Sequence, residues 1–180
     1  MPSNNEQLTQ RLANELGHAV ATEVVRRIES VDARPAEILV LLDELEAVSG
    51  KIARAAIEAL PELDRRAGCS LLIAWLDLGV ALAESSGATA LKYFKDSPLI
   101  LGVMEEAEQR RAVLALGLEL AEDDPNVTWE YLKVSPQLVT AVPAQDLSRW
   151  LEIGMQATQS DPVVGLEYIK QIPALAPVLS

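Results

Sequence analysis

The side chains that could carry chemistry in this sequence are few and do not form the pattern of an active site. The only histidine is His18 and the only cysteine is Cys69. A zinc site needs several His or Cys ligands together, so we interpret His18 as a surface or structural residue and predict neither metal nor cofactor. Cys69 lies near an expected helix start, which could lower the pKa of its thiol. With no histidine nearby in sequence, a packed cysteine is favoured over a nucleophile.

Two groups of carboxylates, Glu105-Glu106 and Glu122-Asp123-Asp124, are the other candidates for a cation site. A calcium loop alternates its ligands around a glycine, and neither group has that spacing. We interpret them as helix-start residues or solvated faces. The sequence also lacks a Gly-rich phosphate loop, a catalytic triad and zinc-ligand spacing. We therefore predict that the chain is not an enzyme, and an all-helical enzyme is the least favoured alternative.

Three lysines recur at one position, two residues after a tyrosine, and are the candidate interaction ridge: Lys95, Lys133 and Lys170. Glu130 and Glu167 stand three residues before two of them. Such pairs stabilise a helix by roughly a few tenths of a kcal/mol. A structural role near the end of a helix is therefore favoured over an anion-binding row.

Composition limits the class of protein. The chain has 180 residues, of which 49% are hydrophobic, enough for a sizeable core. Its formal net charge of -12 is opposite to the basic surface that nucleic acid requires. No apolar run approaches the roughly 20 residues of a membrane helix, and the single cysteine fits a reducing compartment. We predict a cytoplasmic protein that binds neither nucleic acid nor membrane.

An internal repeat runs through most of the chain. The segments "DPNVTWEYLKVSP" and "DPVVGLEYIKQIP" match, and the prolines at their ends belong to the series Pro61, Pro98, Pro136 and Pro173, spaced by 37, 38 and 37 residues. Other residues recur in step with this series, namely Tyr93, Tyr131 and Tyr168; Gly79, Gly117 and Gly154; and Trp75 and Trp150, with Val113 between them. Because these are packing residues, the repeat indicates stacked structural units.

Each repeat is expected to fold as two helices. Apolar residues in "SLLIAWLDLGVALAES" recur at three and four, the helical period. Asp124-Pro125 and Asp161-Pro162 are typical of an N-cap followed by proline at the first helical position. We expect the second helix to run for about ten residues until the next proline of the series ends it. A recurring glycine inside the first helix is explained most simply by close approach of a facing backbone or aromatic ring.

The fold class predicted from these patterns is all-α, an α-hairpin solenoid of about four degenerate repeats of 37–38 residues. Apolar residues spaced by four over residues 8–31 predict one long helix that caps the array. We expect an N-terminal cap over residues 1–34 and a repeat array over 35–180. Only "ALAPVLS" follows Pro173, without a polar cap, so we expect either a longer protein or a last face covered by a partner.

The helix with W-x-x-x-G followed by an aromatic-rich helix ending in Ser-Pro, as in "WLDLGVALAESSGATALKYFKDSPLI", resembles a known family over roughly residues 38–175. This is the helical N-terminal region of bacterial von Willebrand factor A domain proteins that partner MoxR-class AAA+ ATPases, such as nitric oxide reductase activators and Rubisco activase adaptors. The matching positions are Trp75, Gly79, Tyr93, Ser97-Pro98, Gly117, Tyr131, Ser135-Pro136, Trp150, Gly154, Tyr168 and Pro173. The von Willebrand domain with its metal site has no counterpart here.

The resemblance implies a non-catalytic adaptor arm that binds an AAA+ ATPase, a client enzyme such as Rubisco or nitric oxide reductase, or both. The alternative is a stand-alone helical-repeat module that binds a peptide or assembles with itself. An uncovered C-terminal end would favour self-association in either case.

Overall fold

The computed structural model describes residues 1–31, 33–122 and 124–179, with the backbone alone at residues 144, 155 and 179. Over these residues the chain forms α-helices, one short 3-10 helix and no strand, which confirms the predicted all-α fold class. Contacts divide the chain into two compact units, unit 1 over Met1–Gly102 and unit 2 over Val103–Ser180. The division predicted between residues 34 and 35 stays a prediction.

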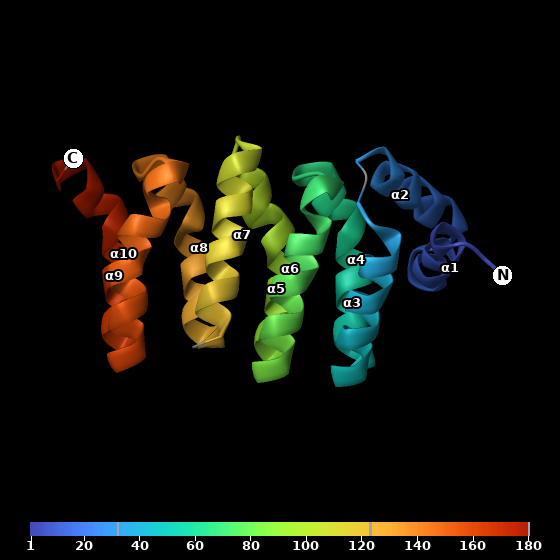
Figure 1. Ribbon diagram of the computed structural model, residues 1–180, viewed down its shortest axis with the longest axis horizontal. Helices are drawn as coiled ribbons and strands as arrows, with labels where there is room; N and C mark the ends of the chain where they lie inside the picture. Colours follow the sequence, from blue (N-terminus) through green and yellow to red (C-terminus); the bar gives the residue numbers. More distant parts are fainter. Residues whose placement is uncertain (32, 123, 180) are drawn as a thin grey trace. The chain divides into compact units, whose positions relative to one another are not determined.

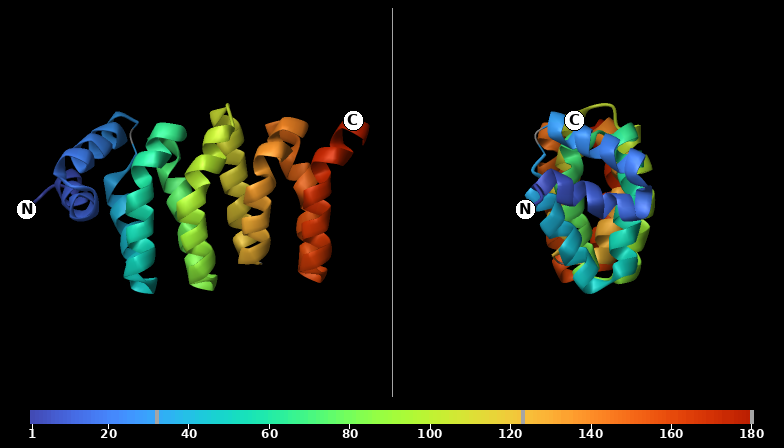
Figure 2. Two further views of the ribbon diagram at one scale, coloured as in Figure 1. Left: turned by 180° about the vertical axis from the view of Figure 1, so that it is seen from behind. Right: turned by 90° about the vertical axis from the view of Figure 1, so that its right-hand side faces the viewer.

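Unit 1 is built from helical hairpins (Figures 1 and 2). Its elements are α1 (Asn4–Leu16), α2 (His18–Ser30), α3 (Pro35–Val48), α4 (Gly50–Arg66), the 3-10 helix η1 (Cys69–Leu71), α5 (Leu72–Ser85) and α6 (Gly87–Val103). The first hairpin packs through both of its helices on α3 and α4, and α3 packs on α5. Successive hairpins therefore bury one another's apolar sides, as in an α-solenoid.

The prediction of one long N-terminal helix is wrong. The stretch forms two helices, α1 and α2, which pack against each other. Gly17 separates them with a φ of 84°, a left-handed conformation that ends α1. The apolar spacing continues across this break, with Leu12 and Val24 both buried, which is why periodicity alone did not reveal the turn.

Unit 2 repeats the hairpin arrangement with α7 (Ala107–Ala121), α8 (Pro125–Ala141), α9 (Ala144–Ser160) and α10 (Pro162–Leu179). Helices α7 and α8 pack as one hairpin, α9 and α10 as the next, and the two hairpins stack through α7 on α9 and α8 on α10. The predicted N-caps are confirmed. Asp124 Oδ1 accepts from the backbone N–H of Asn126 at 2.8 Å, and Asp161 Oδ1 accepts from that of Val163 at 3.0 Å.

The prediction that the prolines of the series end the second helices is wrong. Pro61, Pro98, Pro136 and Pro173 all lie inside helices of 17 or 18 residues, and the last turns of α10 lean away from its first part (Figure 2). Proline leaves the carbonyl four residues earlier without its helical partner. In α8 that carbonyl belongs to Leu132, and it accepts instead from the Ser135 hydroxyl at 2.7 Å. Ser135 and Leu132 are both buried, so packing and this hydrogen bond together offset the break.

Two of the recurring glycines, Gly79 and Gly154, lie where two helices of a hairpin come close, as expected from the sequence. A methyl group added to Gly79 would lie 2.7 Å from Cε1 of Phe94 and closer still to its Cζ. At Gly154 an added methyl group would meet Ile169 Cγ1 at 2.9 Å and Tyr168 Cδ1 at 3.0 Å. The helices can pack at these distances because glycine has no Cβ.

Replacement of Ser135 tests how α8 continues through its proline. Ser135→Ala leaves the buried Leu132 carbonyl unpaired and should lower the free energy of unfolding by about 1–3 kcal/mol. In Ser135→Ala/Pro136→Ala the new backbone N–H of residue 136 can bond this carbonyl, so the double variant should recover most of that loss in urea unfolding. A double variant no more stable than the single one would contradict this explanation.

Replacement of Gly79 tests the close approach of α5 and α6. Gly79→Ala should destabilise the protein by about 1–3 kcal/mol, because the Phe94 ring is fully buried and has little room to move. The matched control is Gly50→Ala, since nothing lies within 4 Å of a methyl group there. Chemical unfolding should show the control to be neutral or slightly more stable, and equal effects at both positions would refute the assignment.

Candidate functional site

The recurring aromatic residues form hydrogen bonds inside the hairpins. The Tyr93 hydroxyl donates to the Trp75 carbonyl at 2.7 Å, and the Trp75 indole N–H donates to Ser97 Oγ at 2.7 Å. Tyr131 repeats the first contact in unit 2 by donating to the Val113 carbonyl at 3.3 Å. In both cases the acceptor stands 18 residues before the tyrosine. Since Trp75, Tyr93 and Tyr131 are fully buried, they serve the scaffold and cannot contact a ligand.

Phe94 completes this cluster in unit 1. Its ring meets Trp75 edge-on with centroids 5.0 Å apart, and Tyr93 at 5.2 Å. Burial raises the pKa of the Tyr93 hydroxyl well above its usual value, with a smaller contribution from the charge of Asp77. The pKa of Tyr131 is raised for the same main reason. Both phenols stay protonated at neutral pH and act as hydrogen-bond donors.

Cys69 has a protonated, buried thiol. Its Sγ donates to Asp64 Oδ1 at 3.1 Å, and Asp64 Oδ2 pairs with Arg27 Nε at 3.2 Å. Burial raises the pKa of the thiol from 9.0 to about 12, and the Asp64 carboxylate adds to this by accepting its proton in a hydrogen bond. A reactive cysteine needs the opposite shift, so this geometry fits the predicted packed cysteine.

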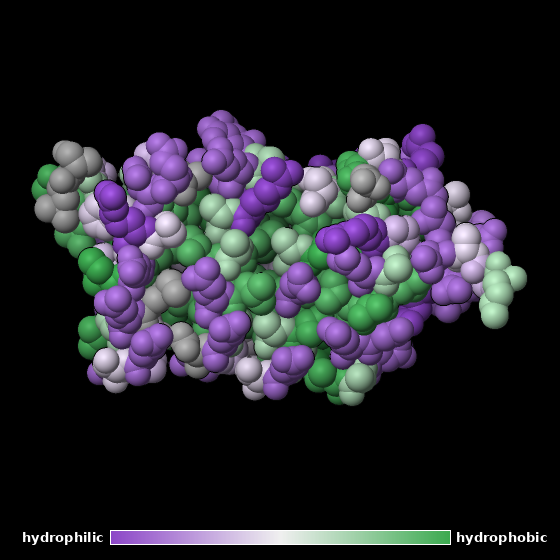
Figure 3. All heavy atoms as spheres, viewed as in Figure 1, coloured by the Kyte–Doolittle hydropathy of each residue, from purple (hydrophilic) through white to green (hydrophobic). Residues whose placement is uncertain are grey.

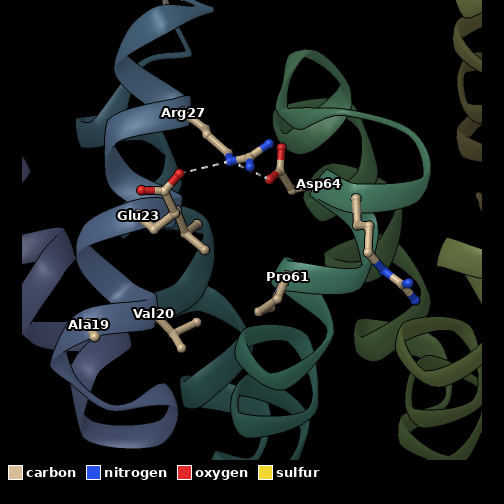
Figure 4. Close-up of a pocket in the computed structure, with 8 residues that line it drawn as sticks. Ala19, Val20, Glu23, Arg27, Pro61 and Asp64 are labelled. Atoms are coloured by element: carbon tan, nitrogen blue, oxygen red, sulfur yellow. Dashed lines mark hydrogen bonds and ion pairs between the residues drawn. The ribbon is translucent and has the colours of Figure 1, made fainter.

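Arg27 and Asp64 also border an open groove between α2 and α4 (Figure 4). Val20 and Pro61 form its apolar part, and its volume is about 500 Å³. Arg27 on α2 crosses the groove to Asp64 on α4, and it also lies 3.4 Å from Glu23 Oε1 on its own helix. The Arg27–Asp64 pair thus joins α2 to α4.

One residue of each carboxylate group lies at a helix start, whereas Glu122 is the C-cap of α7. Glu106 is the N-cap of α7 and forms a capping box with Gln109, and Asp124 is the N-cap of α8. Asp123 lies outside the described residues. Among the residues that the structure describes, no group of three His, Cys, Asp or Glu side chains is placed to hold a metal ion.

The lysines of the candidate ridge are exposed on α6, α8 and α10. Lys133 Nζ pairs with Glu130 Oε1 at 2.7 Å, and Lys170 Nζ lies 3.8 Å from Glu167 Oε1. The residue three before Lys95 is Lys92, so this pairing does not recur in α6. His18 is exposed as the first residue of α2. The role of the ridge in binding stays a prediction.

A second groove, which sequence reasoning missed, lies between α3 and α5 in unit 1. It measures about 260 Å³ and is lined by Ala36, Glu37, Val40, Leu41 and Asp77. Val40 is 55% exposed, although its helix α3 packs against both α4 and α5. The space-filling view shows hydrophobic residues among charged ones over α3 and α5 (Figure 3). We name this feature the α3–α5 groove.

Asp77 gives the α3–α5 groove its charge. Its carboxyl is partly buried, and burial raises its pKa, with a further increase from the Glu37 carboxylate and a decrease from Arg34. Arg34 itself pairs with Glu37 at 2.7 Å. Asp77 thus lies beside apolar side chains, where a cation from a partner would lower the cost of its ionisation. In the sequence, the only signal was an acidic residue within the apolar stretch "WLDLGV".

Comparison of the chain with protein families, with curated proteins and with solved structures found no match. Among the described residues, no helix is both long and apolar enough to cross a membrane.

The raised pKa of Cys69 predicts how stability depends on pH. Below pH 9 the thiol is protonated in both states, whereas between pH 9 and about 12 only the unfolded chain loses the proton. The free energy of unfolding should therefore fall over this window, by at most about 1.4 kcal/mol per pH unit from this thiol. Cys69→Ala lacks this contribution but retains the tyrosines, so the difference between wild type and variant isolates it.

Urea unfolding of both proteins at several pH values measures the effect, and thiol labelling at pH 8 checks its cause. The native thiol should react much more slowly than the same thiol in urea. A parallel pH dependence of the two proteins, or equal labelling rates, would contradict the assignment.

Proposed function

We propose that this chain is a non-catalytic scaffold for protein binding, and that it acts in the cytoplasm as the adaptor arm of a MoxR-class AAA+ ATPase system. The proposal rests on the contrast between residues that are buried inside the hairpins and residues that are exposed between them. Trp75, Tyr93, Tyr131 and Gly79 at the recurring positions are used inside the hairpins. Val40 is exposed and is not repeated in the later hairpins, so it is free to fit one particular partner.

The α3–α5 groove is the binding surface that we assign to this function. Its apolar floor at Val40 and Leu41 suits the aliphatic stem of a lysine or arginine side chain, and Asp77 suits the cationic head. Burial of such a pair at a protein interface gives specificity for a basic partner segment. The net charge of -12 would also speed association with a basic surface.

We do not assign the α2–α4 groove or the α3–α5 groove as an active site. The α2–α4 groove has charged groups that pair with one another, and the α3–α5 groove has two carboxylates without a nucleophile or a histidine among its lining residues. Both are open surfaces between helices. The family resemblance in Trp75, Gly79, Tyr93 and the Ser-Pro pairs supports the choice of AAA+ ATPase as partner.

Affinity capture with the full chain as bait tests the proposal. The wild type should retain an AAA+ ATPase of the MoxR class from the native cytoplasm, identified by mass spectrometry. Val40→Lys adds a positive charge to the floor of the groove, where it repels a basic partner segment, and should reduce the affinity for the purified ATPase at least about tenfold, or 1.4 kcal/mol. The matched control is Val48→Lys, at an exposed valine on the same helix.

Calorimetric titration of the captured ATPase with the three proteins supplies the affinities. If the wild type retains no such ATPase, the adaptor proposal fails. The alternative of a stand-alone helical-repeat module is then favoured. If Val40→Lys binds as well as Val48→Lys does, the assignment of the groove fails.

A further inference from the structure

The two walls of the α3–α5 groove carry carboxylates and aliphatic residues in alternation. Helices α3 and α5 lie side by side and pack on each other (Figure 1), and the repeat spacing of 37 residues relates each position on α3 to one on α5. At four successive levels, one helix has a carboxylate and the other an aliphatic residue. The pairs are Glu37 with Ala74, Val40 with Asp77, Glu44 with Ala81, and Ala47 with Glu84. We call these residues the alternating surface.

The alternating surface extends the groove along both helices. Glu37, Val40 and Asp77 line the groove itself. Glu44 follows Val40 by four residues and Ala81 follows Asp77 by four, so each lies on the same side of its helix as the residue before it. All residues of the surface are exposed or half-buried. Its length from the first level to the last is ten residues of helix, or about 15 Å.

Most carboxylates of the alternating surface lack a counter-ion. Glu37 pairs with Arg34 Nη1 at 2.7 Å. Within the described part of the chain, no lysine or arginine lies within ion-pair distance of the other three, which are Glu44, Asp77 and Glu84. Val40 between them is 55% exposed. The chemical complement of this surface is therefore a segment that offers apolar side chains and several cations together.

This pattern belongs to α3 and α5 and is not a consequence of stacking. In unit 2, α7 packs on α9 in the same way. The residues at the four equivalent levels are Ala112 with Arg149, Ala115 with Glu152, Glu119 with Gln156, and Glu122 with Gln159. Carboxylates do not alternate between these two helices, and a cation is present among them. Because unit 2 stacks without the alternation, the alternation in unit 1 is free to serve binding.

We propose that a basic amphipathic α-helix of a partner protein docks along the alternating surface. Its apolar residues contact Val40 and the alanines, and its lysine or arginine residues lie at the carboxylates on both walls. This inference rests on the assignment of the α3–α5 groove to partner binding in the proposed function, and it specifies the kind of segment that binds there. A second copy of this chain, with its net charge of -12, is a poor source of such a helix.

The spacing of the carboxylates fits a helix better than an extended chain. Counted from Glu37, the later levels lie three, seven and ten residues along the helices, so successive carboxylates on alternating walls are about 5 Å apart along the groove. A helix with apolar residues at heptad positions a and d carries charged residues on its two flanks with a mean spacing of about 5 Å. An extended chain changes sides about every 3.3 Å, and its side chains would fall out of step with the carboxylates.

Titration of the full chain with synthetic peptides tests the proposal. The probe is a fluorescently labelled peptide of three heptads, with leucine at positions a and d and lysine at e and g. The control peptide differs only by a proline at a central position outside a, d, e and g, which breaks the helix but retains the charge. Fluorescence anisotropy should show that the probe binds at least about tenfold more tightly than the control, and circular dichroism should show that it gains helicity on binding.

Variants of the protein locate the site. Glu44→Gln/Glu84→Gln removes two carboxylates from the alternating surface and should raise the dissociation constant of the probe severalfold. The matched control Glu58→Gln/Asp96→Asn removes the same two charges from α4 and α6, so it has the same net charge and should bind as the wild type does. All four residues are exposed, so both variants should fold, and circular dichroism with thermal unfolding checks this.

Three results would overturn the proposal: no binding of the probe, equal affinities of the two peptides, or equal affinities of the two double variants. The proposed function is judged separately by capture of the ATPase. If Val40→Lys loses the ATPase but the two peptides bind equally, the groove assignment holds and the helical partner is refuted. If the probe binds as expected but no ATPase is captured, the helical partner is supported and only the adaptor proposal fails.

Discussion

Each α-helix in the described part of the chain has 13 to 18 residues, and the shorter of these are marginal alone in water because the first turn of a helix is costly to form. Burial against neighbouring helices must supply the missing stability. The contact between adjacent hairpins is therefore the interaction on which the fold depends. It explains why most of the recurring residues are apolar, aromatic or glycine.

The same constraint explains the hydrogen bonds in the core. Buried hydroxyl and indole groups need partners, and they find them within the hairpin, as the Trp75 indole does at Ser97 Oγ. Ser135 supplies the bond that Pro136 removes from the Leu132 carbonyl. These buried polar groups already have partners within the hairpins. The surface that we propose for binding uses exposed residues instead, because the α3–α5 groove combines apolar side chains with a partly buried carboxylate.

The first and last hairpins meet the constraint in different ways. The first hairpin buries its apolar side in unit 1 and turns polar residues outward, as a capping element does. The last hairpin, α9–α10, leaves Ile153 58% exposed, although Leu116 at the same repeat position is 7% exposed.

The sequence by itself determined the helical class, the spacing of the repeats, the N-caps at Asp124 and Asp161, and the close approach at Gly79. These follow from local rules, since a cap or a helical period depends on residues within a few positions of each other. Only the tertiary structure decided that Gly17 breaks the first helix and that α8 continues through Pro136, because burial and a hydroxyl partner outweigh the lost backbone bond there. It also decided the raised pKa of Cys69, the groove at Val40 and Asp77, and the exposure of Ile153. Each of these features depends on which helices pack together, and local sequence patterns do not predict that packing.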